Sequence, residues 1–194
     1  DCQPNNLPVT GMNNRTMEAA MRNPSSGFTM LEVMIAIVVV SFGLLGLAGL
    51  QVFALKNNQS ASLRSAASVL ASDIVDRMKA NFQGVINGQY DRPSTADYTT
   101  GVAGCNATAG CTTNELAAND RFEWAQRVAA SFPGGVGIVC LDSTPDSPAN
   151  PTPAAPGCDG TGATVYVVKI WWVDDRTQGN VAGNLKYVYT SFNP

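Results

Sequence analysis

One acid at the edge of a long uncharged run is the residue with the clearest chemical role in this sequence. From Val33 to Leu55 no residue carries a charge, and Glu32 stands directly before this run. As a helix rising ~1.5 Å per residue, such a segment can cross a hydrocarbon core of ~30 Å. A carboxylate taken into lipid costs on the order of several kcal/mol unless it finds a partner. The position of Glu32 therefore predicts pairing with a cation.

The residues before Glu32 form a short leader followed by an aromatic residue. A short basic leader, Met21-Arg22-Asn23-Pro24-Ser25-Ser26-Gly27, precedes Phe28, and Glu32 is the fifth residue counted from Phe28. This stretch resembles the signal of the type IV pilin family, which includes the pseudopilins of type II secretion. The resemblance implies that a prepilin peptidase cuts after Gly27 and methylates the new amine of Phe28. Gly27 and Phe28 are then a processing substrate rather than an active site.

The same resemblance suggests what Glu32 does. In an incoming subunit it would pair with the Phe28 amine of a neighbour and set the axial register, while the apolar helices pack into a filament core. The simpler alternative is that Glu32 lies in the headgroup zone of an ordinary single-pass anchor. The Gly27-Phe28 pair beside it favours the assembly role.

Composition argues against catalysis and nucleic-acid binding. The chain has no histidine, which removes the commonest general base, the Ser-His and Cys-His dyads and most zinc sites. Its net charge is −3, and no block of Lys and Arg offers a phosphate-binding surface. The sequence predicts a protein that is not an enzyme, binds no cofactor or metal and has no nucleic-acid partner. The consecutive acids Asp174 and Asp175 suggest calcium, but a solvated turn is favoured because alternating oxygen ligands are missing.

Four cysteines follow the apolar run, and Cys2 lies upstream of the expected cleavage point. An even number in loop-like surroundings beyond an export signal predicts disulfides in an oxidising compartment. A four-thiolate metal site is disfavoured because Cys-x-x-Cys spacing is absent. Three pairings are open. The sequential pairing, Cys105 with Cys111 and Cys140 with Cys158, is favoured because each pair closes a short Gly- or Pro-rich loop.

The absence of proline from Phe28 to about Phe82 permits one long helix. Its first half is apolar all round, and its second half has an apolar face at spacings of mostly three and four: Leu55, Leu63, Ala67, Leu70, Ile74 and Met78. We expect three parts: an upstream extension and leader (1–27) that is removed, with translation starting at Met21 or Met17; a transmembrane and polymerisation helix (28–55); and a periplasmic domain (56–194).

Three glycines, Gly43, Gly46 and Gly49, recur in the apolar half. Two interpretations are equally favoured. The glycines are either the ordinary glycines that membrane helices tolerate, or they allow close approach of another helix or local melting of this one. Many major pilins carry a proline near the middle of this segment, where this chain has Gly49.

The carboxyl-terminal half predicts a second helix and a small antiparallel sheet. The helix should begin at Thr113 or Asn114 and end before Pro133. Three strands are expected, at 136–141, 164–173 and 185–192. The Pro-rich stretch 142–162 has too few apolar residues to pack, and Lys169 indicates that its own face of the second strand is the wetter one. The fold class is α+β, with the long amino-terminal helix packed on the sheet in the arrangement of the type IV pilin fold.

Three segments narrow the resemblance to the PilV-type minor pilins: Phe132-Pro133-Gly134-Gly135, Val139-Cys140-Leu141-Asp142-Ser143-Thr144 and Val168-Lys169-Ile170-Trp171-Trp172. It implies a low-copy subunit that primes assembly of type IV pili, the fibres of adhesion and twitching motility. Its partners would be other minor pilins, the major pilin and the inner-membrane assembly platform. The chain would first be a single-pass inner-membrane protein of a Gram-negative bacterium, with a periplasmic domain, and then part of the pilus.

Three alternatives stay open. A minor pseudopilin of type II secretion has a similar topology. A tip-exposed domain could use its loops to bind a host ligand. A secreted protein with an ordinary signal peptide is disfavoured, because Glu32 opens the apolar run and no clear Ala-x-Ala cleavage site follows.

Overall fold

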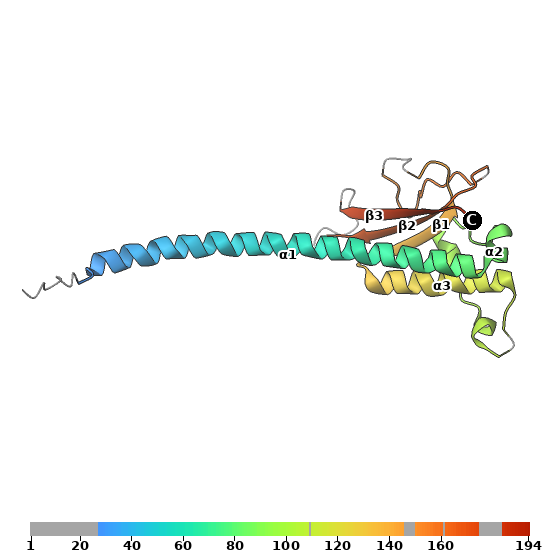
Figure 1. Cartoon of the computed structure of the whole chain (residues 1–194), viewed down its shortest axis with the longest axis horizontal. Coiled ribbons are helices and arrows are strands. Elements are labelled where there is room, and N and C mark those ends of the chain that lie inside the picture. Colours follow the sequence, from blue (N-terminus) through green and yellow to red (C-terminus); the bar gives the residue numbers. More distant parts are fainter. Residues whose placement is uncertain (1–26, 109, 146–149, 161, 175–183) are drawn as a thin grey trace, which may run out of the picture. The chain divides into compact units, whose positions relative to one another are not determined.

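The computed structural model describes residues 27–108, 110–145, 150–160, 162–174 and 184–194 (Figure 1). The chain forms two compact units, the first ending at Ala48 and the second beginning at Gly49. The described residues of the first unit are the start of helix α1 and the three residues before it. The second unit holds the remainder of α1, two further α-helices, two short 3-10 helices and a sheet.

Helix α1 runs from Met30 to Ala80, as the absence of proline predicts. At its start the Thr29 hydroxyl accepts a hydrogen bond from the Glu32 backbone N–H at 3.2 Å, which satisfies one of the free donors of a helix amino terminus. The helix ends two residues before the expected position. Asn81 instead caps the short helix α2, Phe82–Ile86, by accepting a hydrogen bond from the Gly84 N–H at 3.3 Å.

The part of α1 in the second unit places one apolar face on the core. Its buried residues are Ala67, Ala71, Ile74, Val75 and Met78. Leu63 and Leu70 pack against the same core at half-buried positions. The predicted face is therefore confirmed from Leu63 onward, whereas Leu55 is 68% exposed and contributes nothing to it.

Helix α3, Thr113–Ser131, begins where the sequence predicts. A reciprocal capping box forms its start: the Glu115 N–H donates to the Thr112 hydroxyl, and the Thr112 N–H donates to the Glu115 carboxylate. Trp124 and Val128 are buried against α1 and the sheet, and the Trp124 indole N–H donates to the Leu70 carbonyl of α1 at 2.8 Å. The tryptophan is thus a core residue that links the two helices.

Three antiparallel strands in the order β1-β2-β3 form the sheet: Val136–Leu141, Tyr166–Val173 and Leu185–Phe192. In the register, Val168 of β2 lies opposite Val139 of β1 and Thr190 of β3. The predicted bounds of β1 and β3 are confirmed, and β2 begins two residues later than expected. The long helix on a small antiparallel sheet confirms the predicted α+β fold.

The expectation about the second face of the sheet is wrong. All eight residues of β2 are buried, Lys169 included. The described residues of the Pro-rich stretch cover this face, where the Trp171 indole N–H donates to the Pro151 carbonyl and the Lys169 ammonium to the Pro156 carbonyl, both at 2.8 Å. Hydrogen bonds and a disulfide hold the stretch in place, so it needs few apolar side chains of its own.

Candidate functional site

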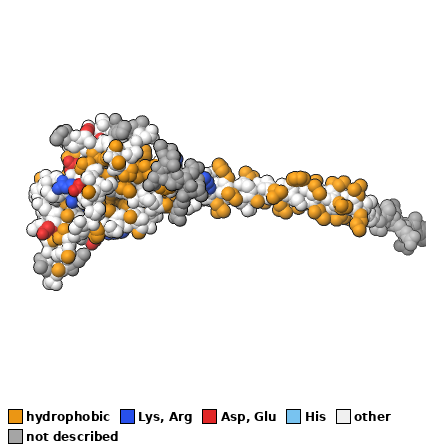
Figure 2. Space-filling view, turned by 180° about the vertical axis from the view of Figure 1, so that it is seen from behind, with side chains coloured by type: hydrophobic (Ala, Val, Ile, Leu, Met, Phe, Trp, Pro, Cys, Tyr) orange, Lys and Arg blue, Asp and Glu red, His pale blue; other side chains and the backbone are white. Residues whose placement is uncertain are grey.

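The amino-terminal segment presents a bare apolar surface with one acid in its first turn. Glu32 lies in the first turn of α1, and the large apolar side chains from Phe28 to Leu55 are exposed, from 48% for Val33 to 87% for Met30. Figure 2 shows such side chains along the drawn face of this segment. Among the described residues, α1 is the one helix long and apolar enough to cross a membrane.

Such a surface requires a cover, which none of the described residues provides. Full burial of a Leu, Val or Phe side chain is worth about 1.5–3 kcal/mol, so a helix exposing this many is stable in lipid or among other apolar helices. Glu32 is exposed and can meet a cation of another molecule there. The arrangement supports membrane anchoring and assembly.

The three glycines of this segment are not required by contacts among the described residues. A methyl group added at Gly43, Gly46 or Gly49 would meet no described atom within 4 Å. Each glycine nevertheless weakens a helix by ~1 kcal/mol relative to alanine. Neighbouring molecules can supply a packing reason for them.

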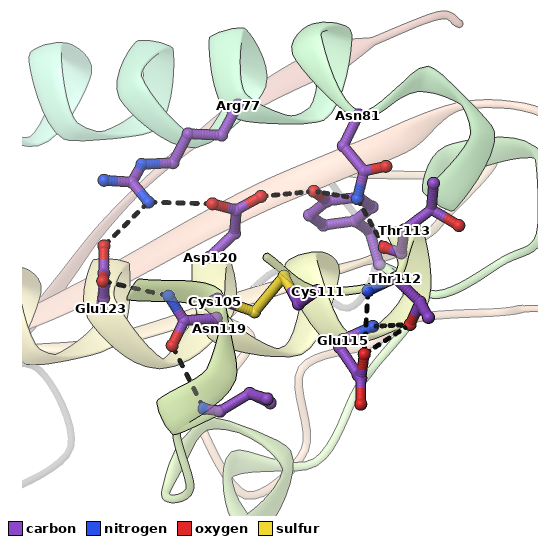
Figure 3. Close-up of a disulfide and its surroundings, with 12 residues drawn as sticks. Arg77, Asn81, Cys105, Cys111, Thr112, Thr113, Glu115, Asn119, Asp120 and Glu123 are labelled. Carbon is purple, nitrogen blue, oxygen red and sulfur yellow. Dashed lines mark hydrogen bonds and ion pairs between the residues drawn. A yellow bond between two sulfur atoms is a disulfide. The ribbon is translucent and has the colours of Figure 1, made fainter. Parts of the chain in front are cut away.

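A polar network joins α1, α3 and the loop between them (Figure 3). Arg77 lies 2.9 Å from Asp120 and 3.2 Å from Glu123. Asp120 also accepts the Tyr90 O–H at 2.7 Å, and the Tyr90 oxygen accepts from Asn81 at 3.2 Å. Burial alone lowers the pKa of the Arg77 guanidinium, but the hydrogen bonds to Asp120 and Glu123 outweigh this and raise it.

Two disulfides stabilise the second unit, in the sequential pairing that the loop lengths favour. Cys105 is bonded to Cys111 in the loop that leads into α3 (Figure 3), and Cys140 of β1 is bonded to Cys158. The second bond closes the Pro-rich stretch at its base. Both loops are short, which limits the chain entropy that each cross-link removes.

A buried ion pair lies beneath the Pro-rich stretch. The Lys169 ammonium is 2.5 Å from the Asp142 carboxylate, and neither side chain is exposed to solvent. The other Asp142 oxygen accepts the Thr144 N–H at 2.9 Å. The sequence carried a signal for this pair, because Tyr166-Val167-Val168-Lys169-Ile170-Trp171-Trp172-Val173 is almost continuously apolar, as in strands buried on both faces. A lysine within such a run requires a buried acid.

Two buried tyrosines predict sensitivity to alkali. Burial raises the pKa of Tyr90 and of Tyr98 above the usual ~10. Because the folded state favours the protonated phenols, their contribution to stability is complete below about pH 10 and is lost as the pH rises further. Urea unfolding followed by tryptophan fluorescence should show a falling free energy of unfolding above about pH 10, with a smaller slope in Tyr90→Phe. Equal slopes in both proteins would contradict this prediction.

The predicted site residues fall in both units. Gly27, Phe28 and Glu32 lie together in the first unit, and the four cysteines form two pairs in the second. Of the two acids considered for calcium, Asp175 lies outside the described residues. Within the described ranges, no group of three His, Cys, Asp or Glu side chains is placed to hold a metal ion.

Two family models match this chain in adjacent stretches. The prokaryotic N-terminal methylation motif matches residues 22–48, and the model for type IV pilin Tt1218 matches residues 49–122. Neither a curated protein nor a solved structure matches the chain. The fold and the amino-terminal segment define a structural subunit of a membrane-assembled fibre. The chain belongs to the type IV pilins. Because members of this family are structural subunits, the prediction that the protein is not an enzyme is confirmed.

Proposed function

We propose that this pilin is a minor subunit of PilV type that primes pilus assembly and enters the fibre at low copy. The three segments that resemble PilV-type minor pilins support this role, because they contact one another in the second unit. The Phe132 ring stacks on Trp172 with 5.6 Å between centroids, and Asp142 pairs with Lys169. The resemblance thus covers one contiguous part of the core rather than scattered positions.

Processing and anchoring follow from the first unit in this proposal. Prepilin peptidase removes the leader by cutting after Gly27 and methylates the Phe28 amine. Residues 28–55 anchor the chain in the inner membrane, and residues 56–194 form the periplasmic domain. The single observation that carries the anchoring and assembly part of the proposal is the uncovered apolar surface of α1 with Glu32 in its first turn.

Assembly then brings the Glu32 carboxylate to the Phe28 amine of a neighbouring pilin. The pair offsets part of the cost of burying both charges, while the apolar helices cover one another. Other minor pilins, the major pilin and the inner-membrane assembly platform are the partners of this step. Gly43, Gly46 and Gly49 carry no side chain, so they leave room for the helix of a neighbouring subunit to approach closely.

Deleting the gene should greatly reduce the number of surface pili without lowering the cellular level of the major pilin. The reason is that a priming subunit acts before elongation. Pili counted by electron microscopy, with quantitative mass spectrometry of sheared fibres, check both the effect and the low copy number. Mass spectrometry of the mature chain should show a methylated Phe28 as its first residue.

Three outcomes would contradict the proposal. Normal piliation together with loss of protein secretion would assign the chain to a type II secretion system. A copy number equal to that of the major pilin would make it a bulk subunit. A mature terminus beyond Gly49 would contradict the processing step itself.

A further inference from the structure

A cleft in the second unit lies where four distant segments meet. Its volume is about 480 Å³, within the range of ~300–1,000 Å³ typical of ligand sites. The 3-10 helix Thr95–Tyr98, α3, the start of β1 and the Pro-rich stretch form its walls. We call it the β1 cleft and define it by Thr99, Ala125, Ala129, Gly137 and Pro153.

At the outer edge of β1, the buried residue Gly137 lines this cleft. Further along the same edge, the Val139 N–H donates to the Tyr98 hydroxyl at 2.6 Å, and the Leu141 N–H donates to the Asp91 carboxylate at 2.9 Å. The Val139 carbonyl accepts the Arg92 N–H at 3.0 Å. The outer edge is therefore satisfied from Val139 to Leu141 by groups of the loop before α3.

Gly137 differs from Val139 and Leu141, whose outward peptide groups are paired. Alternate residues of an antiparallel strand direct both N–H and C=O to the same edge, so the Gly137 groups point outward as those of Val139 do. Neither group has a hydrogen-bond partner among the residues that the structure describes. Gly137 therefore offers one donor and one acceptor to an occupant of the β1 cleft.

The shape of the cleft depends on small residues. A Cβ atom at Gly137 would lie 2.4 Å from the Trp124 ring, so only glycine lets β1 approach α3 this closely. Ala125 and Ala129 of α3 keep the cleft open, and Thr95, Thr99 and Gln126 give it polar groups. None of the described side chains that line the cleft is charged.

We infer that the β1 cleft binds an extended polypeptide segment of a neighbouring pilus subunit, which adds beside β1 and exchanges a pair of hydrogen bonds with Gly137. Strand addition uses an unpaired edge of this kind, and a pocket beside the edge selects the side chains. The small, uncharged lining selects a segment of small, uncharged residues. This interaction goes beyond the priming role. It is expected whether the chain is a rare or an abundant subunit of the pilus.

A carbohydrate fits the same cleft less well. Sugar binding commonly uses an exposed aromatic face or a carboxylate, whereas Tyr98 of this cleft is 4% exposed and its described lining residues include no acid. The unpaired peptide groups of Gly137 instead match the backbone of another chain. Carbohydrate is therefore an outcome that the experiment must be able to report.

Photocrosslinking in the assembled pilus tests the inference with the full chain. A benzophenone amino acid replaces Gln126 at the cleft, and in a matched control it replaces Ala130, which is exposed on α3 and does not line the cleft. We expect the Gln126 position to crosslink a defined segment of another pilus subunit, mapped by mass spectrometry, at least about tenfold more than the Ala130 position, a ratio that corresponds to about 1.4 kcal/mol.

Two further variants separate binding in the cleft from mere proximity. Ala129→Tyr fills the cleft at an exposed position and should abolish the crosslink, whereas Ala130→Tyr should leave it unchanged. In the mapped partner segment, proline at the crosslinked residue should abolish the product, because proline lacks the N–H that the Gly137 carbonyl would accept. Alanine at the same residue should leave the product unchanged. An absent crosslink, equal yields at both positions, a carbohydrate or lipid adduct, or indifference to Ala129→Tyr would overturn the inference. None of these results depends on whether deletion reduces piliation.

Discussion

Replacing Glu32 by Ala should leave this pilin in the membrane and reduce its incorporation into the pilus at least about tenfold. A neighbour's Phe28 amine would then be buried among apolar helices without a counter-charge, and removing one partner of a buried pair typically costs about 3–5 kcal/mol. Each 1.4 kcal/mol corresponds to about a tenfold change in an association constant. The readouts are the amount of this chain in sheared pili and its co-purification with other pilins.

Three comparisons make the Glu32 result interpretable. Glu32→Gln keeps the size of the side chain and should fail as Glu32→Ala does, because the charge is the property at stake. Gln51→Ala changes an exposed polar residue of the same helix and should assemble normally. The mass of the mature amino terminus shows whether each variant was cleaved. Normal piliation and normal co-purification of a cleaved Glu32→Gln chain would refute the pairing role.

Replacing Asp142 by Ala should remove about 3–5 kcal/mol of folding stability, which is a large part of the ~5–15 kcal/mol typical of a domain. The Lys169 ammonium is completely buried, and without Asp142 it would keep the Pro156 carbonyl as its partner among the described residues. Urea unfolding of the detergent-solubilised chain measures the loss. All three tryptophans of the chain lie in the second unit, so their fluorescence reports on that unit alone.

A double-mutant cycle separates the charge from the packing. Lys169→Met combined with Asp142→Asn removes both charges and keeps an oxygen for the Thr144 N–H, so the double variant should be more stable than Asp142→Ala. The control is Asp76→Ala, which breaks an exposed ion pair with Lys79 and should change stability by less than about 0.5 kcal/mol. Equal losses for Asp142→Ala and Asp76→Ala would show that the buried pair contributes nothing specific.

Local patterns accounted for most of the secondary structure. The capping box at Thr112 and Glu115 lies within four residues, and the strands β1 and β3 are bounded by turn residues, so their limits could be predicted. Lys169 was misjudged for a different reason. Alternation along a strand gives the polarity of one face, but it does not reveal that a distant segment covers that face with its backbone carbonyls.

The β1 cleft could not be predicted from any pattern. Gly137 is one of 18 glycines, and its role depends on the Trp124 ring that packs against it and on Tyr98, which bonds Val139 instead. No spacing in the chain encodes which N–H groups of a strand edge are satisfied by side chains. Only the packed structure distinguishes Gly137 from Val139.

The sequence by itself determined the amino-terminal segment of this pilin. The methylation motif, the uncharged helix and Glu32 are read from consecutive residues, because local composition specifies a helix that contacts lipid or similar helices. Tertiary structure alone decided what the second unit does with its polar residues. The partners of Arg77 and Asp142 lie far away along the chain, in other elements of the second unit. Burial depends on the whole fold. Lys169 therefore suggests a solvent-exposed face in the sequence but forms a buried ion pair in the structure.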